Sequence, residues 1–453
     1  MRTVFSLLTF LLLHSFNGQA QDLQSKIEEY MNAQLANNAF SGVILIAKGN
    51  EVLYQQGYGH ALAKYNIKNN VDTRFRLGSI TKQFTAMAIM QYVEQGKIDL
   101  QDKITNYLPD YPKVQGDKIT IHHLLTHTSG IPSYTGDPEV MKNRASIVEA
   151  PDEFIKRFNE KELEFEPGAE FSYNNSGYYL LGMILEKVGG KPYDQVLADN
   201  IFKPLGMENS GYEHYQNVIP YLSQGYSVIG DDPLRCNFIN TDIAYAAGAL
   251  YSTVGDLHRW HLALSNNELV SAETKAKIYT PEKANYGYGW EIDQMHNRTS
   301  YAHGGGIDGF STFIARFPEE DVCVVALSNY ENAQCGNICR AITAMHFGEA
   351  YEVPEILKSI ELKEGVFEQY AGAYNIFPDF DIKIFAEKGR YFAQATGQDA
   401  FEIHPESPTM FYTKVVNAKL EFIKGDSGQY DQIILHQNGQ HKGKRLAAAV
   451  GNE

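Results

Sequence analysis

The chain has 453 residues, 43% hydrophobic and 21% charged, a composition typical of a soluble globular protein and not of a disordered one. Its formal net charge is −16 and no stretch is rich in lysine and arginine, which argues against nucleic acid or an anionic lipid surface as a partner. A chain of this length exceeds what one small core serves, so two domains are expected.

The N-terminus has the pattern of a targeting segment. Arg2 precedes the apolar run FSLLTFLLLHSF, which is too short to span a bilayer, and Gly18-Gln19-Ala20 offers a small-residue cleavage site. We therefore predict a signal peptide over residues 1–20. No later segment is long and apolar enough to cross a membrane, so we expect an exported protein, periplasmic or secreted, with no stable membrane insertion.

Over the first 350 residues the expected strands lie at both ends and the helices between them. A helix over about 23–36 precedes two strands, GVILIAK and EVLYQQGYG, which Gly49-Asn50 joins as a tight hairpin. A helix begins near Ser79, and a mostly helical stretch runs from about 99 to 266. Strands return in YGYGWEI, SYAH, FSTFIARF and VCVVALSN, before a last helix over about 333–345. We predict an α+β fold in which helices flank an antiparallel sheet that carries an inserted helical region.

The rest of the chain has a different character. A charged, irregular stretch containing Pro354 predicts a linker over 351–365 after a first domain over 21–350. Residues 366–453 hold short strand patterns separated by turn signals: YAGAYNI, FDIKIFAE, RYFAQATG, TMFYTKV, KLEFIKG and QIILHQNG. These patterns predict a small all-β barrel-like domain or a sandwich.

Ser79 is the only serine with a lysine three residues later, and it stands where a buried helix should begin. Lys82 lies one turn further, on the same helix face. Burial should shift its ammonium toward the neutral amine, which can take a proton from a neighbouring hydroxyl. The pair is a candidate activated nucleophile, although an ordinary N-cap serine gives the same pattern.

A second polar cluster lies in FSYNNSGYYLLG. Tyr173 and Asn175 are two residues apart, just before a helix expected to begin near Ser176. One interpretation is a plain helix cap by Asn175 or Ser176. The functional interpretation makes Tyr173 a general acid or base and Asn175 a donor to a substrate amide.

A third cluster begins at His303 and continues through Gly304, Gly305 and Gly306. It contains a formal G-x-G-x-x-G, but the strand-like FSTFIARF follows where a dinucleotide fingerprint must open a helix. The glycines instead favour close approach of the backbone to a ligand, or a bulged strand. His303 is expected to point into a groove, with a structural histidine as the alternative.

Other chemistries find little support in the sequence. His123 and His127 are four residues apart, but no acidic third ligand accompanies them, so a packed helix end is favoured over a metal site. No G-x-S-x-G motif and no Walker A loop occur. The four cysteines suggest neither a metal site nor a thiol nucleophile.

Ser79-Ile80-Thr81-Lys82, Tyr173-Asn174-Asn175 and His303-Gly304-Gly305 occur in the order found in the serine β-lactamase and penicillin-binding superfamily. The chain resembles its class C-like branch, which includes D-Ala-D-Ala peptidases, D-aminopeptidases and esterases. The resemblance covers about residues 27–347. Supporting stretches are FRLGSITKQFTA, LLTHTSGIP, FSYNNSGYYLLG, AAGALYSTVGDL and HGGGIDGF. The C-terminal segment resembles, more weakly, the lipocalin-like β domain often appended to such hydrolases.

The resemblance implies an acyl-enzyme mechanism on a small-molecule or peptide substrate, with no metal or organic cofactor. Ser79 would attack a carbonyl, Lys82 and Tyr173 would share the proton transfers, and Asn175 would orient the substrate. The N–H groups of Ser79 and Gly306 would form the oxyanion hole. Whether Lys82 or Tyr173 is the base stays open.

One departure limits the analogy. Many members carry Lys-Thr-Gly where this chain has His303-Gly304-Gly305, so a cation for a substrate carboxylate is missing and efficient β-lactamase activity is not expected. The leading hypothesis is a hydrolase of D-amino-acid peptides. The alternatives are a class C-like β-lactamase or esterase, a non-turnover penicillin-binding or sensor protein, and a function carried by the C-terminal domain.

Overall fold

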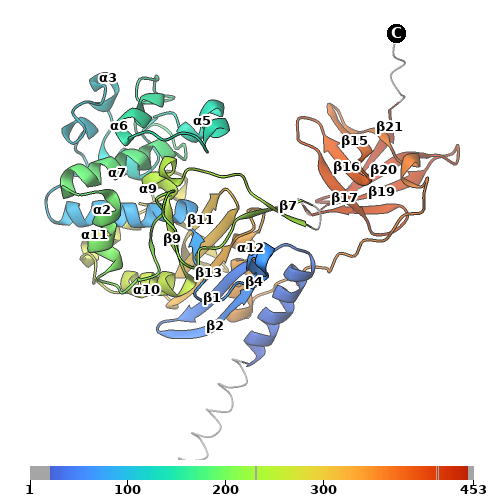
Figure 1. Ribbon diagram of the computed structural model, residues 1–453, viewed down its shortest axis with the longest axis horizontal. Helices are drawn as coiled ribbons and strands as arrows, with labels where there is room; N and C mark the ends of the chain where they lie inside the picture. Colours follow the sequence, from blue (N-terminus) through green and yellow to red (C-terminus); the bar gives the residue numbers. More distant parts are fainter. Residues whose placement is uncertain (1–20, 230–231, 415, 417, 447–453) are drawn as a thin grey trace, which may run out of the picture. The chain divides into compact units, whose positions relative to one another are not determined.

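The computed structural model describes residues 21–229, 232–414, 416 and 418–446 (Figure 1). The predicted signal peptide lies outside the described residues. The chain divides into two compact units, the first formed mainly by residues 40–227 and 233–352 and the second mainly by residues from 353 onward. Among the described residues, no helix is both long and apolar enough to span a bilayer.

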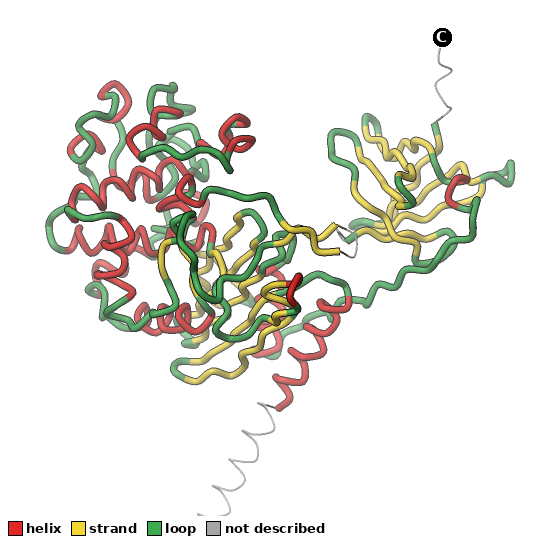
Figure 2. Tube along the Cα trace, viewed as in Figure 1, coloured by secondary structure: helices red, strands yellow, loops and turns green. Residues whose placement is uncertain are grey.

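A six-stranded antiparallel sheet is the centre of the first unit (Figure 2). Its order is β10-β11-β12-β13-β1-β2, so strands from the two ends of this unit's sequence pair side by side. Lys48 pairs with Glu51 across Gly49-Asn50, and Gly49 has a φ of 53°, which confirms the predicted hairpin. The bounds are β1 Gly42–Lys48, β2 Glu51–Tyr58, β10 Glu291–Met295, β11 Arg298–Ile307, β12 Phe310–Phe317 and β13 Val322–Ser328.

Both faces of this sheet are covered. β13 is buried along its whole length, and its alternate residues Cys323, Val325 and Leu327 belong to the large core cluster on one face. α10 (Val254–Ser265) packs on β1 and β13, and α12 (Cys335–Phe347) packs on β12 and β13. Such double burial explains the continuous apolar run of β13, because neither face needs polar side chains.

The inserted region between β2 and β10 is mostly helical, as predicted, but it also contains short strands. Among these, β5, β9 and β6 form a small sheet. Two- and three-residue strands are too short for periodicity to indicate them. The helices are α3 Lys113–Gly116, α4 Ile121–Leu125, α5 Pro138–Asn143, α6 Pro151–Phe154, α7 Asn175–Gly189, α8 Tyr193–Leu197, α9 Tyr245–Gly248 and α11 Ala272–Ile278; the strands are β3 His60–Leu62, β4 Ile67–Lys68, β5 Phe75–Arg76, β6 Gly211–Tyr212, β7 Tyr226–Ile229, β8 Asp232–Arg235 and β9 Leu250–Ser252.

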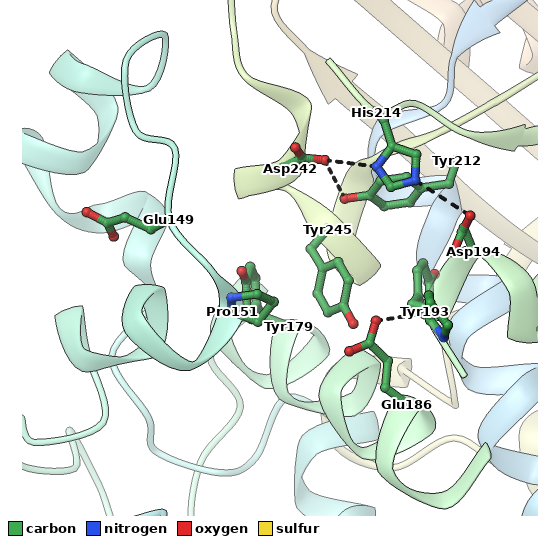
Figure 3. A pocket seen from close by; sticks show the side chains of 11 residues that line it. Glu149, Pro151, Tyr179, Glu186, Tyr193, Asp194, Tyr212, His214, Asp242 and Tyr245 are labelled. Carbon is green, nitrogen blue, oxygen red and sulfur yellow. Dashed lines mark hydrogen bonds and ion pairs between the residues drawn. The ribbon is translucent and has the colours of Figure 1, made fainter. Parts of the chain in front are cut away.

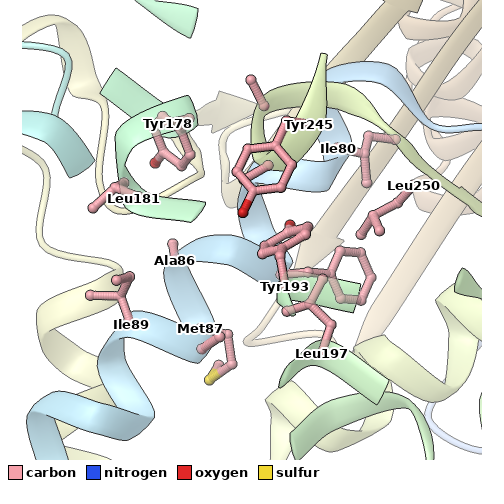
Figure 4. Packing of buried hydrophobic residues seen from close by; sticks show 14 of the residues in the cluster. Ile80, Ala86, Met87, Ile89, Tyr178, Leu181, Tyr193, Leu197, Tyr245 and Leu250 are labelled. Atoms are coloured by element: carbon pink, nitrogen blue, oxygen red, sulfur yellow. The ribbon is translucent and has the colours of Figure 1, made fainter. Parts of the chain in front are cut away.

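α2 (Thr81–Glu94) crosses the core of this unit, and every residue from Thr81 to Met90 is buried. It packs against α7, α8, α9 and α11. Ala86, Met87 and Ile89 meet apolar side chains from several of these helices (Figure 4). A helix that is buried on all sides needs no polar stripe, which explains its weak amphipathicity. Its packed surroundings fix the position of its first turn, where Lys82 lies, directly after the turn that carries Ser79.

The second unit is a closed eight-stranded barrel, β14 to β21 in sequence order. β14 and β21 close it by pairing Tyr374 with Arg445. This confirms the predicted barrel-like domain, although β17 and β21 were not predicted; the polar sequence QHKGKR of β21 carries no apolar alternation. The bounds are β14 Gly372–Phe377, β15 Phe380–Glu387, β16 Arg390–Ala395, β17 Phe401–Pro405, β18 Met410–Thr413, β19 Ala418–Lys424, β20 Tyr430–His436 and β21 Gln440–Arg445.

Two local expectations were wrong. The strand predicted in YGYGWEI begins only at Glu291, because Gly289 has a φ of 77° and interrupts extended structure. The cap of α7 is Asn174, not Asn175 or Ser176: the Asn174 side-chain oxygen accepts from Gly177 N at 2.7 Å. Asn175 is thereby the first residue of the helix and is free to make other contacts.

Candidate active site

Ser79 lies in a 3₁₀ turn, Gly78–Ile80, directly before α2. Leu77 N donates to Leu250 O at 2.8 Å, which ties the turn to β9. On its other side the turn meets β11: Gly78 has a φ of 55°, and a Cβ there would lie 2.9 Å from Gly306 N. The backbone therefore holds Ser79 between two strands and leaves it little freedom.

Lys82 is fully buried, and its Nζ lies close to three oxygen atoms. The distances are 3.0 Å to Ser79 Oγ, 2.8 Å to Asn175 Oδ1 and 2.9 Å to Ala247 O. Burial lowers the pKa of Lys82 well below its usual value. Among the described residues, no carboxylate counteracts this shift, so the structure favours the neutral amine.

The neutral amine has a defined orientation here. Asn175 Oδ1 and Ala247 O can only accept hydrogen bonds, so the two N–H bonds of a neutral Lys82 point to them. The remaining lone pair then faces Ser79 Oγ, which can donate its proton along the 3.0 Å contact. This arrangement is the one that activates a hydroxyl as a nucleophile.

Asn175 joins Lys82 to a loop on the other side of the site. Its Nδ2 donates to Thr135 Oγ1 at 3.0 Å, and its backbone N donates to Ser133 Oγ at 3.3 Å. The Ser133 and Thr135 hydroxyls are themselves 2.9 Å apart. Since an amide nitrogen carries two protons, one N–H of Asn175 remains for a further acceptor.

Tyr173 covers Lys82 and Ser79. Lys82 Nζ lies 4.8 Å from the centre of the Tyr173 ring. The residue is 39% exposed, and its hydroxyl interacts with Ser79. Burial raises the pKa of Tyr173 above its usual value, and the Ser79 contact only partly opposes this rise. The hydroxyl is therefore neutral near pH 7 and can donate a proton.

His303 lies beside these groups but faces the protein interior. It is 2% exposed; its Nδ1 is 2.6 Å from Gly304 O and its Nε2 is 2.9 Å from Tyr286 Oη. Because a carbonyl only accepts, we assign the proton to Nδ1, so that Nε2 accepts from Tyr286. Burial lowers the pKa of His303 to about 3. The expectation of a histidine that points into a groove is wrong, since both ring nitrogens are engaged within the protein.

The three glycines after His303 have different surroundings. A Cβ on Gly305 would lie 2.0 Å from Leu77 O, so this position tolerates no side chain. A Cβ on Gly304 would make ordinary contacts, and one on Gly306 would meet nothing within 4 Å. Gly305 thus permits a close backbone approach to Leu77, directly before the Ser79 turn; the predicted approach to a ligand stays a prediction.

Ser79, Asn175 and Gly306 open into a common cavity of about 120 Å³. Its walls are mainly apolar, with contributions from Met141, Ile239, Ile243, Ala244, Ala247 and Ile307. At its rim Asp308 is bound by Arg144 at 2.6 Å. The cavity thus presents a nucleophile and an amide donor to a small, largely apolar group.

Several contributors were not expected from the sequence. Ala247, Thr135 and Tyr286 hold Lys82, Asn175 and His303 respectively, and no spacing relates them to their partners. His127 lies with its ring 4.4 Å from that of Tyr173, and its Nδ1 accepts from Asn174 N at 3.0 Å. Its place after a helix end was predicted, but its role in positioning the Tyr173–Asn175 segment was not.

Comparison with known proteins agrees with this geometry. A family model described as Beta-lactamase matches residues 23–340. Penicillin-binding protein 4* of Bacillus subtilis (strain 168) is 28% identical over 439 residues, which cover 89% of this chain and 94% of that protein. The latter match extends beyond the first unit into the barrel.

Two solved structures are similar. The octameric penicillin-binding protein homologue from Pyrococcus abyssi has a TM-score of 0.66 and 26% identity, and the match covers 93% of this chain and 99% of that one. A D-stereospecific amidohydrolase from Streptomyces sp. has a TM-score of 0.63 and 28% identity over 72% of this chain and 99% of that one. The resemblance inferred from the three motifs is confirmed.

Proposed function

The chain belongs to the Beta-lactamase family, and from this premise we propose that it is an exported serine hydrolase that forms an acyl-enzyme on a small amide or ester. D-amino-acid peptides are the substrate class we favour, cleaved in the manner of a D-Ala-D-Ala carboxypeptidase or a D-aminopeptidase. The observation that carries the proposal is the buried Lys82, whose Nζ lies 3.0 Å from Ser79 Oγ. The similarity to a D-stereospecific amidohydrolase supports the substrate class.

Acylation begins when Ser79 Oγ attacks the substrate carbonyl. The Oγ–H bond breaks and its proton passes to the lone pair of Lys82, while a new bond forms between Oγ and the carbonyl carbon. The backbone N–H groups of Ser79 and Gly306 would stabilise the negative oxygen. Asn175 would donate its remaining N–H to the acyl part of the substrate.

Tyr173 serves as the proton donor in this scheme. Its raised pKa keeps the hydroxyl protonated, so it can protonate the leaving amine or alkoxide and then regain a proton from Lys82. Water next attacks the acyl carbon and gives one proton to Lys82; the ester bond to Ser79 then breaks, Ser79 Oγ takes that proton back, and the acid leaves. In this scheme Lys82 is the base; the sequence left Lys82 and Tyr173 as alternatives.

Efficient β-lactamase activity is disfavoured by the same geometry. The lysine cation that holds a substrate carboxylate in many relatives is replaced by His303, which is neutral and has both nitrogens occupied. The apolar cavity walls fit a short acyl group, so an esterase is the second candidate.

Intact-mass spectrometry with a fluorophosphonate probe tests the proposal directly. The mature wild-type protein should gain one adduct and Ser79→Ala none, with Ser129→Ala, which removes another buried serine, as the matched control. Turnover of D-Ala peptides and short-chain esters should fall about 10⁶-fold in Ser79→Ala. Folded wild-type protein that forms no adduct with the probe and none with a penicillin would instead support a binding protein.

A further inference from the structure

A second cavity of about 240 Å³ lies between α6, α7 and α8 and the segment that leads into α9 (Figure 3). Carboxylates and tyrosines dominate its lining, and no lysine or arginine contributes to it. We propose that this cavity binds a small organic ammonium ion. Its volume is below the roughly 300–1,000 Å³ of sites for drug-sized ligands, which indicates a small ligand.

The negative charge of the cavity is only partly compensated. Glu149 at its edge is paired with Arg157 at 2.5 Å. His214 Nε2 lies 3.5 Å from Asp194 Oδ2, and its Nδ1 lies 3.7 Å from Asp242 Oδ1. A single imidazole is therefore the partner of both carboxylates. Glu186 has no cationic partner among the described residues; its Oε1 accepts from Tyr193 N at 2.8 Å. A cation inside the cavity would complete this arrangement.

Tyr245 gives independent evidence that a ligand is missing. The residue is 6% exposed, and its hydroxyl has no hydrogen-bond partner among the described residues. The hydroxyl points into the cavity toward Glu186 (Figure 3). Burial, followed by the charge of Glu186 and a side-chain contact with it, raises the pKa of Tyr245; the contact falls outside hydrogen-bond geometry. The N–H groups of a primary ammonium could donate to both oxygens and satisfy this buried hydroxyl, whereas a quaternary ammonium such as choline could donate only through its own hydroxyl.

The tyrosine rings favour an organic cation over a metal ion. The ring of Tyr245 lies 4.8 Å from that of Tyr179, 5.1 Å from that of Tyr193 and 6.2 Å from that of Tyr212. Aromatic faces attract alkylammonium groups, whereas hard metal ions need several converging oxygens. Among the described residues, no group of three histidine, cysteine, aspartate or glutamate side chains is arranged to hold a metal.

Titration of the full chain with choline and with 3,3-dimethylbutan-1-ol, its uncharged isostere, tests the proposal. Calorimetry at low salt should detect saturable binding of choline only. Glu186→Gln retains the acceptor for Tyr193 N but loses the charge, and should weaken choline about tenfold. Glu149→Gln is the matched control, because its charge is already paired, and should change the affinity less than about twofold.

Tyr245→Phe adds a second measurement with n-propylammonium as the probe. Because the hydroxyl is unpartnered, its removal should not lower the melting temperature, whereas n-propylammonium should bind more weakly. Asp194→Asn supplies a second charge variant if Glu186→Gln does not fold. Equal binding of choline and its isostere, or unchanged binding in the folded charge variants, would overturn the proposal. Fluorophosphonate labelling of Ser79 reports on the other site independently.

Discussion

Two cavities lie on either side of residues 242–248, and they differ in the ionisable groups beside them: one adjoins a buried amine, and the other is lined by carboxylates. Beside Ser79, the buried amine of Lys82 has no carboxylate partner among the described residues. On the other side of residues 242–248, Glu186, Asp194 and Asp242 line a cavity to which no lysine or arginine contributes. Burial without a carboxylate partner favours the neutral amine of Lys82, which the proposed mechanism uses as a base. The carboxylates of the second cavity are only partly compensated, which is the ground for proposing that it binds a cation.

A permanent positive charge at position 82 is the strongest test of the neutral amine proposed there. Lys82→Arg keeps a cation that cannot act as a base, so turnover should fall about 10⁶-fold, the scale found when a nucleophile loses its base. Lys118→Arg, on an exposed side chain, is the control and should leave turnover unchanged. Substantial turnover in Lys82→Arg, measured with the substrate identified for the wild type, would mean that Tyr173 is the base.

The pH dependence of activity in Tyr173→Phe tests whether Lys82 or Tyr173 is the base. Losing the proton donor should lower kcat about 10²–10⁴-fold. Activity should still decline on acidification, because below its depressed pKa Lys82 gains a proton and loses its lone pair. The pH profile of kcat/KM should therefore keep its acid limb in the variant. Disappearance of that limb would assign it to Tyr173.

The Ser79 cavity also depends on a close steric contact at Gly305. Gly305→Ala would place a Cβ 2.0 Å from Leu77 O, and should cost about 1–3 kcal/mol of unfolding free energy while displacing Ser79. Gly306→Ala, one residue on, meets nothing within 4 Å and should retain wild-type stability. Denaturant unfolding measures both variants, and equal stabilities would contradict this account.

Acidification should destabilise the fold through the buried His303. Burial lowers the pKa of His303 to about 3, so below pH 6.5 the unfolded chain binds a proton that the native protein does not. Stability should fall by about 1.4 kcal/mol per pH unit for this group between those pH values. His303→Gln should show a shallower decline of melting temperature with falling pH. An unchanged slope would rule out this contribution.

Much of this protein could be predicted from its sequence because the relevant signals are local. Apolar alternation and turn residues indicated β1, β2, β12 and most barrel strands. The one-turn spacing of Ser79 and Lys82 placed them on the same helix face, and local order then gave the α+β class. Strand β21 was not predicted because its residues carry no apolar alternation, and β17 was not predicted because it has only five residues and ends at a proline.

The details of the site required the tertiary structure. The role proposed for Lys82 depends on the fold, which buries its amine against Ala247 O and Asn175 Oδ1, two atoms that lie far away in the sequence. His303 turns inward because Tyr286 offers it a partner, and Tyr245 loses its partner because its surroundings leave a space. Sequence by itself determined which reactive groups exist and which elements carry them. Only tertiary packing decided their burial, protonation and free hydrogen-bonding positions, because these depend on neighbours that no local pattern encodes.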